Sequence, residues 1–318
     1  MCNSFVYDTP CSGIEIGVRG NPTRITENYN GFFGWLQDSF VRIDARDNGD
    51  GSVYTHHFYL SSGPQNAPSR NVVFEYGYYT RSSVADGTSF GTFLNLSGQN
   101  QDLVIRNNVF DDDSCGTYIV DCSSGGEDPE EFCDGMEIYS NVFQSNCPLA
   151  LNLVSTQRAR IFNNVFIGGS QILYLEDGER AAEDAWFYNN TVYCTGGCDT
   201  FASFTGSDNR FFNNLIYAEG GGNVVAGGCS AFGGGDGPNF VNNFLYAPGN
   251  SPRLPDCGSG NSTEFSSDPG FADAEGGDFH ITADSPAAGF GTAENAPVDD
   301  FDGVVRPDPP SAGAFDAP

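Results

Sequence analysis

The sequence contains no lysine, because all thirteen of its basic residues are arginine. Any mechanism that needs a lysine base or a lysine Schiff base is therefore excluded. Against these 13 cations stand 42 acidic residues, which give the 318-residue chain a formal net charge of −29. A surface this acidic argues against nucleic acids and anionic lipids as partners, because like charges repel. It is compatible with cation binding and with solubility in salty surroundings.

The sequence also has no long apolar run. No segment is long enough to cross a bilayer, and the N-terminus has no signal-peptide core. Cys-x-x-Cys pairs, the short spacing expected of a zinc cluster, are missing too. We therefore expect neither a transmembrane segment nor a structural zinc site.

Ten cysteines are present, a high and even number. Such a set is typical of loop-closing disulfides in an oxidising compartment, although sequence alone does not fix their connectivity. We therefore expect a secreted or cell-surface protein, with lipidation of the first cysteine as an alternative to its pairing. The candidates are near neighbours along the chain: Cys2 and Cys11, Cys115 and Cys122, Cys133 and Cys147, Cys194 and Cys198, and Cys229 and Cys257.

A short phrase built around two asparagines recurs six times in the middle of the chain. Its copies begin at residues 105, 138, 161, 187, 211 and 240. The spacing of roughly 23 to 33 residues is typical of a solenoid. The second asparagine is present in every copy, whereas Ser140 replaces the first asparagine once.

The residues around each pair predict β-strands that bend at the asparagines. They are β-branched or aromatic, which favours strand, and apolar residues lie two before the first asparagine and two after the second. Asparagine tolerates the left-handed conformation that a one-residue bend needs. In coils stacked about 4.8 Å apart, the second asparagines can form a hydrogen-bonded ladder. The expected ladder residues are Asn108, Asn141, Asn164, Asn190, Asn214 and Asn243.

These features predict an all-β, single-stranded parallel β-helix. The competing solenoid, a leucine-rich repeat, needs recurring leucines and a helical segment, and neither is visible. The phrase resembles that of right-handed parallel β-helix repeat proteins, the pectate-lyase-like superfamily. The end of the chain resembles the closing segment of bacterial surface β-helix proteins, with the sequences DPGF at 268–271, GDFHI at 277–281, DSPA at 284–287, DGVVRP at 302–307 and GAF at 313–315.

The resemblance covers roughly residues 100–318. It implies a right-handed β-helix at or outside a bacterial-type cell surface, often with an anchor just beyond the closing segment. It implies no particular activity, because one fold hosts many functions.

We interpret residues 1–318 as one β-helix domain. Residues 1–100 are expected to form an N-terminal cap and irregular coils, and residues 101–247 the regular ladder coils. Residues 248–318, which carry most of the prolines, are expected to form the C-terminal cap, locked by a salt bridge between Asp302 and Arg306. Of three Asn-x-Ser/Thr sequons, only those at Asn95 and Asn261 are expected to be accessible, because the third lies in the ladder phrase.

An acidic insertion at residues 111–135 and a glycine-rich one at 218–238 interrupt the repeat. Long loops on solenoids often form the binding face. Clustered carboxylates suit Ca²⁺, which takes hard oxygen ligands, so Asp111, Asp112 and Asp113 are candidate calcium ligands. The alternative is a solvated acidic loop.

Two further groups are candidate ligand contacts. Arg158 and Arg160 precede one copy of the phrase and could grip acidic sugars, because a guanidinium matches a carboxylate. Pairing with surface carboxylates is the alternative. Tyr193, Tyr217 and Tyr246 follow three successive copies at the same place, so a solenoid would align them in a column suited to sugar rings. Stacking that holds the coils together is the alternative.

No catalytic residue is assigned. The favoured hypothesis is an extracellular or cell-surface structural or adhesive protein, non-enzymatic, that contacts a polysaccharide or cell-surface glycan or assembles into filaments. The alternative is a Ca²⁺-assisted, arginine-dependent polysaccharide lyase that acts on an acidic polysaccharide. A polygalacturonase is not expected, because its Gly-His-Gly and lysine-containing signatures are absent.

Overall fold

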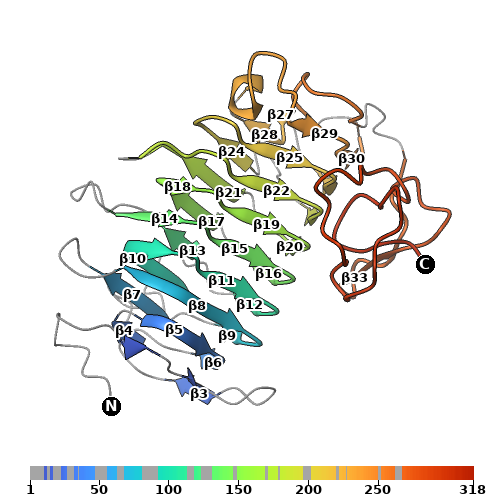
Figure 1. Cartoon of the computed structure of the whole chain (residues 1–318). Helices are drawn as coiled ribbons and strands as arrows, with labels where there is room; N and C mark the ends of the chain where they lie inside the picture. The colour runs from blue at the N-terminus through green and yellow to red at the C-terminus, as the bar shows by residue number, and fades with distance from the viewer. Residues whose placement is uncertain are drawn as a thin grey trace.

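Almost every strand of the protein pairs in parallel with strands of neighbouring repeats. Figure 1 shows the strands piled in one direction from β4 (Phe32–Gly34) to β30 (Phe244–Tyr246), with the C-terminal residues beside the pile. The predicted all-β class and parallel stacking are confirmed, and the arrangement is consistent with a β-solenoid. The computed structural model describes residues 11–12, 15–16, 23–26, 32–34, 36–46, 56–62, 68–80, 92–112, 118–122, 131–145, 149–168, 171–177, 180–195, 202–219, 222–226, 228–249, 252–261 and 267–318.

The strands that follow the asparagine bends form a nine-stranded sheet. It consists of β3 (Thr23–Thr26), β6 (Ile43–Arg46), β9 (Tyr78–Thr80), β12 (Val109–Asp112), β16 (Val142–Ser145), β20 (Val165–Ile167), β23 (Thr191–Cys194), β26 (Leu215–Ala218) and β30.

A 20-stranded sheet holds the remaining stacked strands in two rows that share β10. We call the strands that lead into the asparagine bends the bend row: β1 (Cys11–Ser12), β2 (Glu15–Ile16), β5 (Leu36–Val41), β8 (Ser69–Glu75), β11 (Val104–Arg106), β14 (Phe132–Asp134), β15 (Glu137–Tyr139), β18 (Thr156–Gln157), β19 (Arg160–Phe162), β22 (Trp186–Tyr188), β25 (Arg210–Phe212) and β29 (Phe240–Val241). The return row contains β4, β7 (Phe58–Ser62), β10 (Leu94–Gln101), β13 (Tyr118–Cys122), β17 (Leu149–Val154), β21 (Gln171–Glu176), β24 (Ala202–Phe204) and β28 (Val225–Ala226).

Smaller elements follow the last coils. β27 (Gly222–Asn223) pairs with β31 (Pro252–Arg253), and β32 (Phe271–Asp273) pairs antiparallel with β33 (Asp278–Ile281). The 3₁₀ helix η1 spans Cys229–Phe232. Nothing in the described part of the chain is a helix long and apolar enough to span a membrane.

The first residue of each asparagine pair makes the predicted left-handed bend. Its φ angle lies between 49° and 55° in all six copies, including the copy with Ser140. In the coil before the first copy, Tyr76 takes this conformation with a φ of 54°, and Gly77 occupies the ladder position. A Cβ atom at Gly77 would lie 2.6 Å from the Tyr79 ring and 3.0 Å from Asn108 Oδ1, so this position has no room for a side chain.

The apolar residues on either side of the pair point inward and stack in register. Ile105, Ile138 and Ile161 align on adjacent strands and are at most 1% exposed. After the bend, the rings of Phe110, Phe143 and Phe166 stack with centroids 4.9 Å apart. Apolar residues of adjacent coils therefore form one continuous core between the sheets.

The second asparagines lie in file and are hydrogen-bonded from coil to coil. The Nδ2 atoms donate to the next Oδ1 atoms over 3.0, 3.0, 3.0, 3.3 and 2.9 Å, from Asn108 to Asn243. From Asn141 onward, each Oδ1 also accepts the main-chain N–H of the preceding ladder asparagine, as Asn164 Oδ1 does from Asn141, and Asn108 Oδ1 accepts that of Gly77. The ladder thus satisfies polar groups that the bends bury.

Asn261 extends the ladder by one position. Its Oδ1 accepts Asn243 Nδ2 over 3.0 Å, and its Nδ2 donates to the carbonyls of Phe240 and Cys257. Both N–H groups of this amide are therefore engaged. A glycan on Nδ2 would displace these hydrogen bonds, so the expectation that this sequon is available in the folded chain is wrong.

Residues 267–318 form a lobe along the outward face of the nine-stranded sheet. We call these residues the C-terminal lobe. Its Phe279 and Phe315 pack against Val165, while its Ile281 and other apolar residues pack against Leu215. The contacts are spread over several coils, so the lobe covers the flank of the stack. Figure 1 shows it at the side of β20 and β30.

The first asparagines of the pairs attach this lobe to the coils. Asn163 Nδ2 donates to the Asp299 carbonyl over 2.8 Å, and Asn213 Nδ2 donates to the Thr292 carbonyl over 2.8 Å. Asn242 Nδ2 makes the equivalent bond to a lobe carbonyl over 3.0 Å. The same residue type therefore supplies both the left-handed bend and an amide that docks the lobe.

The expected salt bridge between Asp302 and Arg306 is wrong. The Arg306 guanidinium is buried and pairs with the buried Asp316 carboxylate, and its Nη2 donates to Asn163 Oδ1 over 2.7 Å. Asp302 instead lies 2.6 Å from Nε2 of His280. Arg306 fastens the lobe to a coil through Asn163, whereas its ion-pair partner Asp316 lies ten residues further along the chain, within the lobe.

Candidate functional site

The tyrosine column lies on the outward face of the nine-stranded sheet. The centroids of Tyr193 and Tyr217 are 4.7 Å apart, and those of Tyr217 and Tyr246 are 5.2 Å apart. Tyr193 also packs against Phe271 and Phe279 of the C-terminal lobe. Burial, together with a hydrogen bond to a neighbouring glutamate, raises the Tyr217 pKa well above its usual value. These rings contact one another and the lobe, so they do not form an open ridge.

The two arginines predicted to grip acidic sugars are paired with carboxylates of adjacent coils. Arg158 Nε lies 2.7 Å from Asp134 Oδ1, and Arg160 Nη2 lies 3.0 Å from Asp184 Oδ2. The hydrogen bond that Arg158 donates to Asp134 raises the Arg158 pKa above its ordinary value. Each side chain thus has an internal partner that a sugar carboxylate would have to displace.

The predicted calcium ligands are only partly described. Asp111 Oδ2 accepts a hydrogen bond of 2.7 Å from the Tyr78 hydroxyl. Asp112 is described as the last residue of β12 but not in its side chain, and Asp113 lies outside the described residues. Among the side chains that the structure places, no three or more His, Cys, Asp or Glu residues are grouped to hold a metal ion. Calcium binding by this loop stays a prediction.

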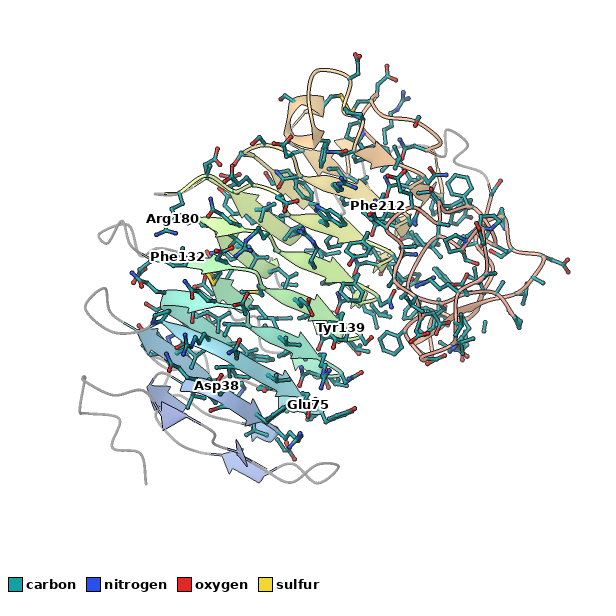
Figure 2. All side chains as sticks on the ribbon, viewed as in Figure 1. Asp38, Glu75, Phe132, Tyr139, Arg180 and Phe212 are labelled. Carbon is teal, nitrogen blue, oxygen red and sulfur yellow. A yellow bond between two sulfur atoms is a disulfide. The ribbon has the colours of Figure 1, made fainter. Side chains whose placement is uncertain are left out.

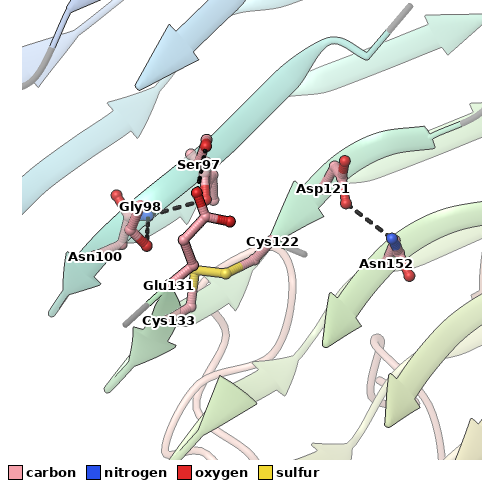
Figure 3. The surroundings of a disulfide bond; sticks show 9 residues. Ser97, Gly98, Asn100, Asp121, Cys122, Glu131, Cys133 and Asn152 are labelled. Carbon is pink, nitrogen blue, oxygen red and sulfur yellow. Dashed lines mark hydrogen bonds between the residues drawn. A yellow bond between two sulfur atoms is a disulfide. The ribbon is translucent and has the colours of Figure 1, made fainter. Parts of the chain in front are cut away.

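Two disulfides are described. Cys122 of β13 bonds to Cys133 of β14, the next strand of the same coil, beside the hydrogen bond between Asp121 and Asn152, as Figure 3 shows. This bond therefore joins one cysteine of the candidate pair Cys115 and Cys122 to one of the candidate pair Cys133 and Cys147. Cys229 bonds to Cys257, and Cys194 is also disulfide-bonded. Of the other candidates, Cys11 is described only in its backbone, and Cys2, Cys115, Cys147 and Cys198 lie outside the described residues.

An aromatic column that sequence reasoning missed runs along the outward face of the bend row. Tyr139, Phe162, Tyr188 and Phe212 occupy the position just before the bend in four successive copies. Their rings stack with centroids 4.8, 5.0 and 4.8 Å apart. Figure 2 shows Tyr139 and Phe212 on the same side of the stack. The recurrence of an aromatic residue at this place was a signal in the sequence.

Toward the N-terminal coils, the same row of outward side chains consists of charged residues instead of aromatic ones. Glu75, only 2% exposed, accepts hydrogen bonds of 2.8 Å from Arg42 Nε and Arg106 Nε. Burial raises the Glu75 pKa, but the hydrogen bonds from Arg106 and Arg42 outweigh burial, so the net pKa is lowered. Arg106 Nη1 then donates to the Tyr139 hydroxyl over 2.9 Å, which joins the charged and aromatic parts of the column.

Beside this column, one indole ring lies between two guanidinium groups. Trp186 aligns with Arg160 and Arg210 on adjacent strands, and their Cζ atoms lie 4.0 and 4.2 Å from its ring. Arg160 is paired with an aspartate. Within the described part of the chain, Arg210 has no carboxylate at salt-bridge distance, so its N–H groups are available to a ligand.

The aromatic column ends at a cleft of about 320 Å³, and Arg210 forms part of its wall. Phe212 of β25 and residues 292–295 of the C-terminal lobe lie on either side. Most of the other lining residues carry amides or hydroxyls: Asn239, Asn242, Ser259, Thr292 and Asn295. Among the described residues of the lining, Glu294 supplies the only carboxylate. The volume lies within the range of roughly 300–1,000 Å³ that is usual for small-molecule sites.

Comparisons with models of known protein families and with curated proteins give no match for this chain. Its function is therefore argued from the surface chemistry of the bend row and of the cleft.

Proposed function

We propose that the chain is a single-stranded right-handed parallel β-helix, related in build to the pectate-lyase-like superfamily. We propose further that it acts outside the cell as a non-enzymatic adhesive or scaffold protein that contacts glycans. The observation that carries the proposal is the amide- and hydroxyl-lined cleft at the end of the outward aromatic column. Amide and hydroxyl groups both donate and accept hydrogen bonds, which suits a ligand rich in hydroxyls.

The disulfides support an extracellular setting. Disulfides such as Cys122–Cys133 and Cys229–Cys257 persist in oxidising compartments and are rare where thiols are kept reduced. Together with the asparagine ladder, they give a stiff rod whose outward side chains keep a fixed spacing. Such a rod suits display of a binding surface, and assembly of several rods into filaments stays a prediction.

The lining of the cleft favours binding over cleavage. Hydrolysis of a glycosidic bond commonly uses two carboxyl groups on either side of that bond, and Glu294 is the single acid among the described residues of this lining. The lysine base of some lyases is excluded by the sequence. An arginine-dependent lyase would use a guanidinium, and the two arginines predicted to grip acidic sugars, Arg158 and Arg160, are paired with aspartates.

The proposal is tested with the full chain, purified with its disulfides intact. We expect it to bind at least one class of glycan on an array and to leave the length of the bound glycan unchanged. In parallel, the chain is incubated with acidic polysaccharides and Ca²⁺ while absorbance in the ultraviolet is followed. Release of unsaturated, absorbing products would replace the proposal by the calcium-assisted lyase, and an array without any bound glycan would refute glycan contact.

A further inference from the structure

We propose that the cleft between Phe212 and residues 292–295 of the C-terminal lobe binds one neutral sugar unit. This inference rests on the proposed glycan contact and adds a site and a ligand class to it. The site lies at the junction of the bend row and the lobe, and its described lining comes from residues 210–212, 238–242 and 259 of the coils and from residues 292–295 of the lobe. Neither part forms the cleft by itself.

The apolar floor of the site includes a ring at the end of the aromatic stack. One face of Phe212 is stacked on Tyr188, with centroids 4.8 Å apart. On the other side, the next coil places Val241 in register, so Val241 adjoins the second face, and Val241 and Phe212 together form the apolar floor of the cleft. Phe212 is only 3% exposed and can be reached by a ligand only within the narrow cleft. The C–H groups of a sugar ring are the kind of surface that such a floor accommodates.

The walls of the site keep unused hydrogen-bonding capacity. Within the described part of the chain, the side-chain amide of Asn239 has no hydrogen-bond partner. Asn242 uses its Nδ2 on the lobe carbonyl of Phe290, which leaves its Oδ1 to accept. Thr292 Oγ1 accepts a main-chain N–H within the lobe and keeps its own proton to donate. Donors and acceptors thus surround the floor, as the several hydroxyls of a sugar require.

The charges around the site favour a neutral sugar over an acidic one. Arg210 and Glu294 line the same cleft with opposite charges, so the site itself is close to electrically balanced. The chain as a whole has a formal net charge of −29, which repels an anionic polymer before it reaches the cleft. Salt screens this repulsion only beyond a Debye length of about 8 Å. A neutral glycan approaches without that repulsion.

The test compares neutral and uronate-containing oligosaccharides on one array, followed by calorimetric titration of the best-bound soluble oligosaccharide. Asn239→Ala and Arg210→Gln are expected to bind it about tenfold more weakly, which corresponds to about 1.4 kcal/mol. Arg70→Gln is the matched control, since it removes the same charge from an exposed bend-row position outside the cleft. Thermal melting of each variant checks that it folds, and Thr292→Val offers a second way to remove a wall group.

Each outcome decides one point. Neutral binding that both cleft variants weaken and Arg70→Gln preserves supports the site. Neutral binding that the cleft variants leave unchanged overturns the site and leaves the proposed glycan contact standing. Binding of uronates alone overturns the neutral ligand class. If the native chain binds no oligosaccharide of either kind, the site and the proposed function both fail.

Discussion

Replacement of Asn164 by alanine should destabilise the stack more than most single substitutions would. Asn164 is fully buried in the middle of the ladder. Its Oδ1 accepts the main-chain N–H and the Nδ2 of Asn141 over 3.1 and 3.0 Å. Its Nδ2 donates to Asn190 Oδ1 over 3.0 Å, to the Ile138 carbonyl over 2.8 Å and to the Phe162 carbonyl over 3.0 Å. Alanine removes all five bonds from a place that water does not reach.

The size of the destabilisation depends on which hydrogen bonds the former partners of Asn164 keep. The Asn141 main-chain N–H loses its side-chain acceptor, and an orphaned buried donor costs about 1–3 kcal/mol. The Nδ2 of Asn141 keeps two carbonyl acceptors, and Asn190 Oδ1 keeps the Asn164 main-chain N–H. Each remaining lost bond is therefore worth about 0.5–1.5 kcal/mol. We expect a total loss of roughly 3–5 kcal/mol in the free energy of unfolding.

Guanidinium denaturation followed by far-ultraviolet circular dichroism measures this loss. Hydrogen exchange of the amides around residue 164 then shows whether the coil opens locally, because stacked repeats need not unfold as one unit. Asn261→Ala is the comparison at the end of the ladder, because Asn261 is half-buried and water can reach part of the space that its side chain leaves. We expect this variant to lose less stability than Asn164→Ala, because only the Asn243 main-chain N–H is left without its acceptor in a buried place.

Asn164→Asp sharpens the test, because it keeps the shape of the side chain and turns the donor into an acceptor. The new oxygen faces Asn190 Oδ1 and the Ile138 carbonyl, and burial raises the pKa of the introduced carboxyl. With the folded pKa above the unfolded pKa, stability relative to the native chain is greatest at low pH and is lost as the pH rises. Equal losses for Asn164→Ala and Asn261→Ala, or a loss below about 1 kcal/mol at Asn164, would refute the reasoning.

Three further predictions concern the lobe and the disulfides. Arg306→Gln leaves a buried carboxylate unpaired and should cost about 3–5 kcal/mol; hydrogen exchange should accelerate within residues 267–318, and unchanged exchange there would contradict the pairing. Hydrogen bonds to the carboxylates of Asp302 and Asp278 raise the His280 pKa above its ordinary value. The stabilisation is then complete below the unfolded pKa and is lost as the pH rises through the folded pKa; an NMR titration that gives an ordinary pKa for this imidazole would sink the argument. Peptide mapping without reduction should recover Cys122 linked to Cys133, and replacing both by alanine should lower stability by roughly 3 kcal/mol; a different linkage would contradict the bond between β13 and β14.

The regular coils could be predicted because the same local chemistry recurs in each copy. The period, the left-handed first residue and the inward columns all follow from strand alternation around the pair, as with Ile105 and Phe110. Asn261 was missed as a ladder residue, because its coil lacks the flanking apolar residues. The place of Asn261 in the ladder depends on the preceding coil, where Asn243 donates a hydrogen bond to it.

The position of the lobe and the cleft could not be predicted, because both depend on contacts between distant segments. Nothing local to Arg210 indicates that residue 292 will face it, and the salt bridge of Arg306 follows from where Asp316 folds back. Whether Tyr193 is exposed or covered likewise depends on where the lobe docks. The column was expected from the repeat, whereas its cover by Phe279 follows from the docking of the lobe.

The C-terminal lobe is docked to the first asparagine of several asparagine pairs. This docking fixes how many coils the chain can hold between residues 163 and 242. For the described residues, amide–carbonyl contacts with the lobe run from Asn163 to Asn242, and the copy before them carries Ser140 in place of the amide. A coil inserted on the N-terminal side of residue 140 would lengthen the rod and leave the contacts of the lobe undisturbed. A coil inserted between 163 and 242 would move some of these amides out of step with their carbonyls by about 4.8 Å. Variation in rod length among chains of this design is thus confined to the N-terminal side.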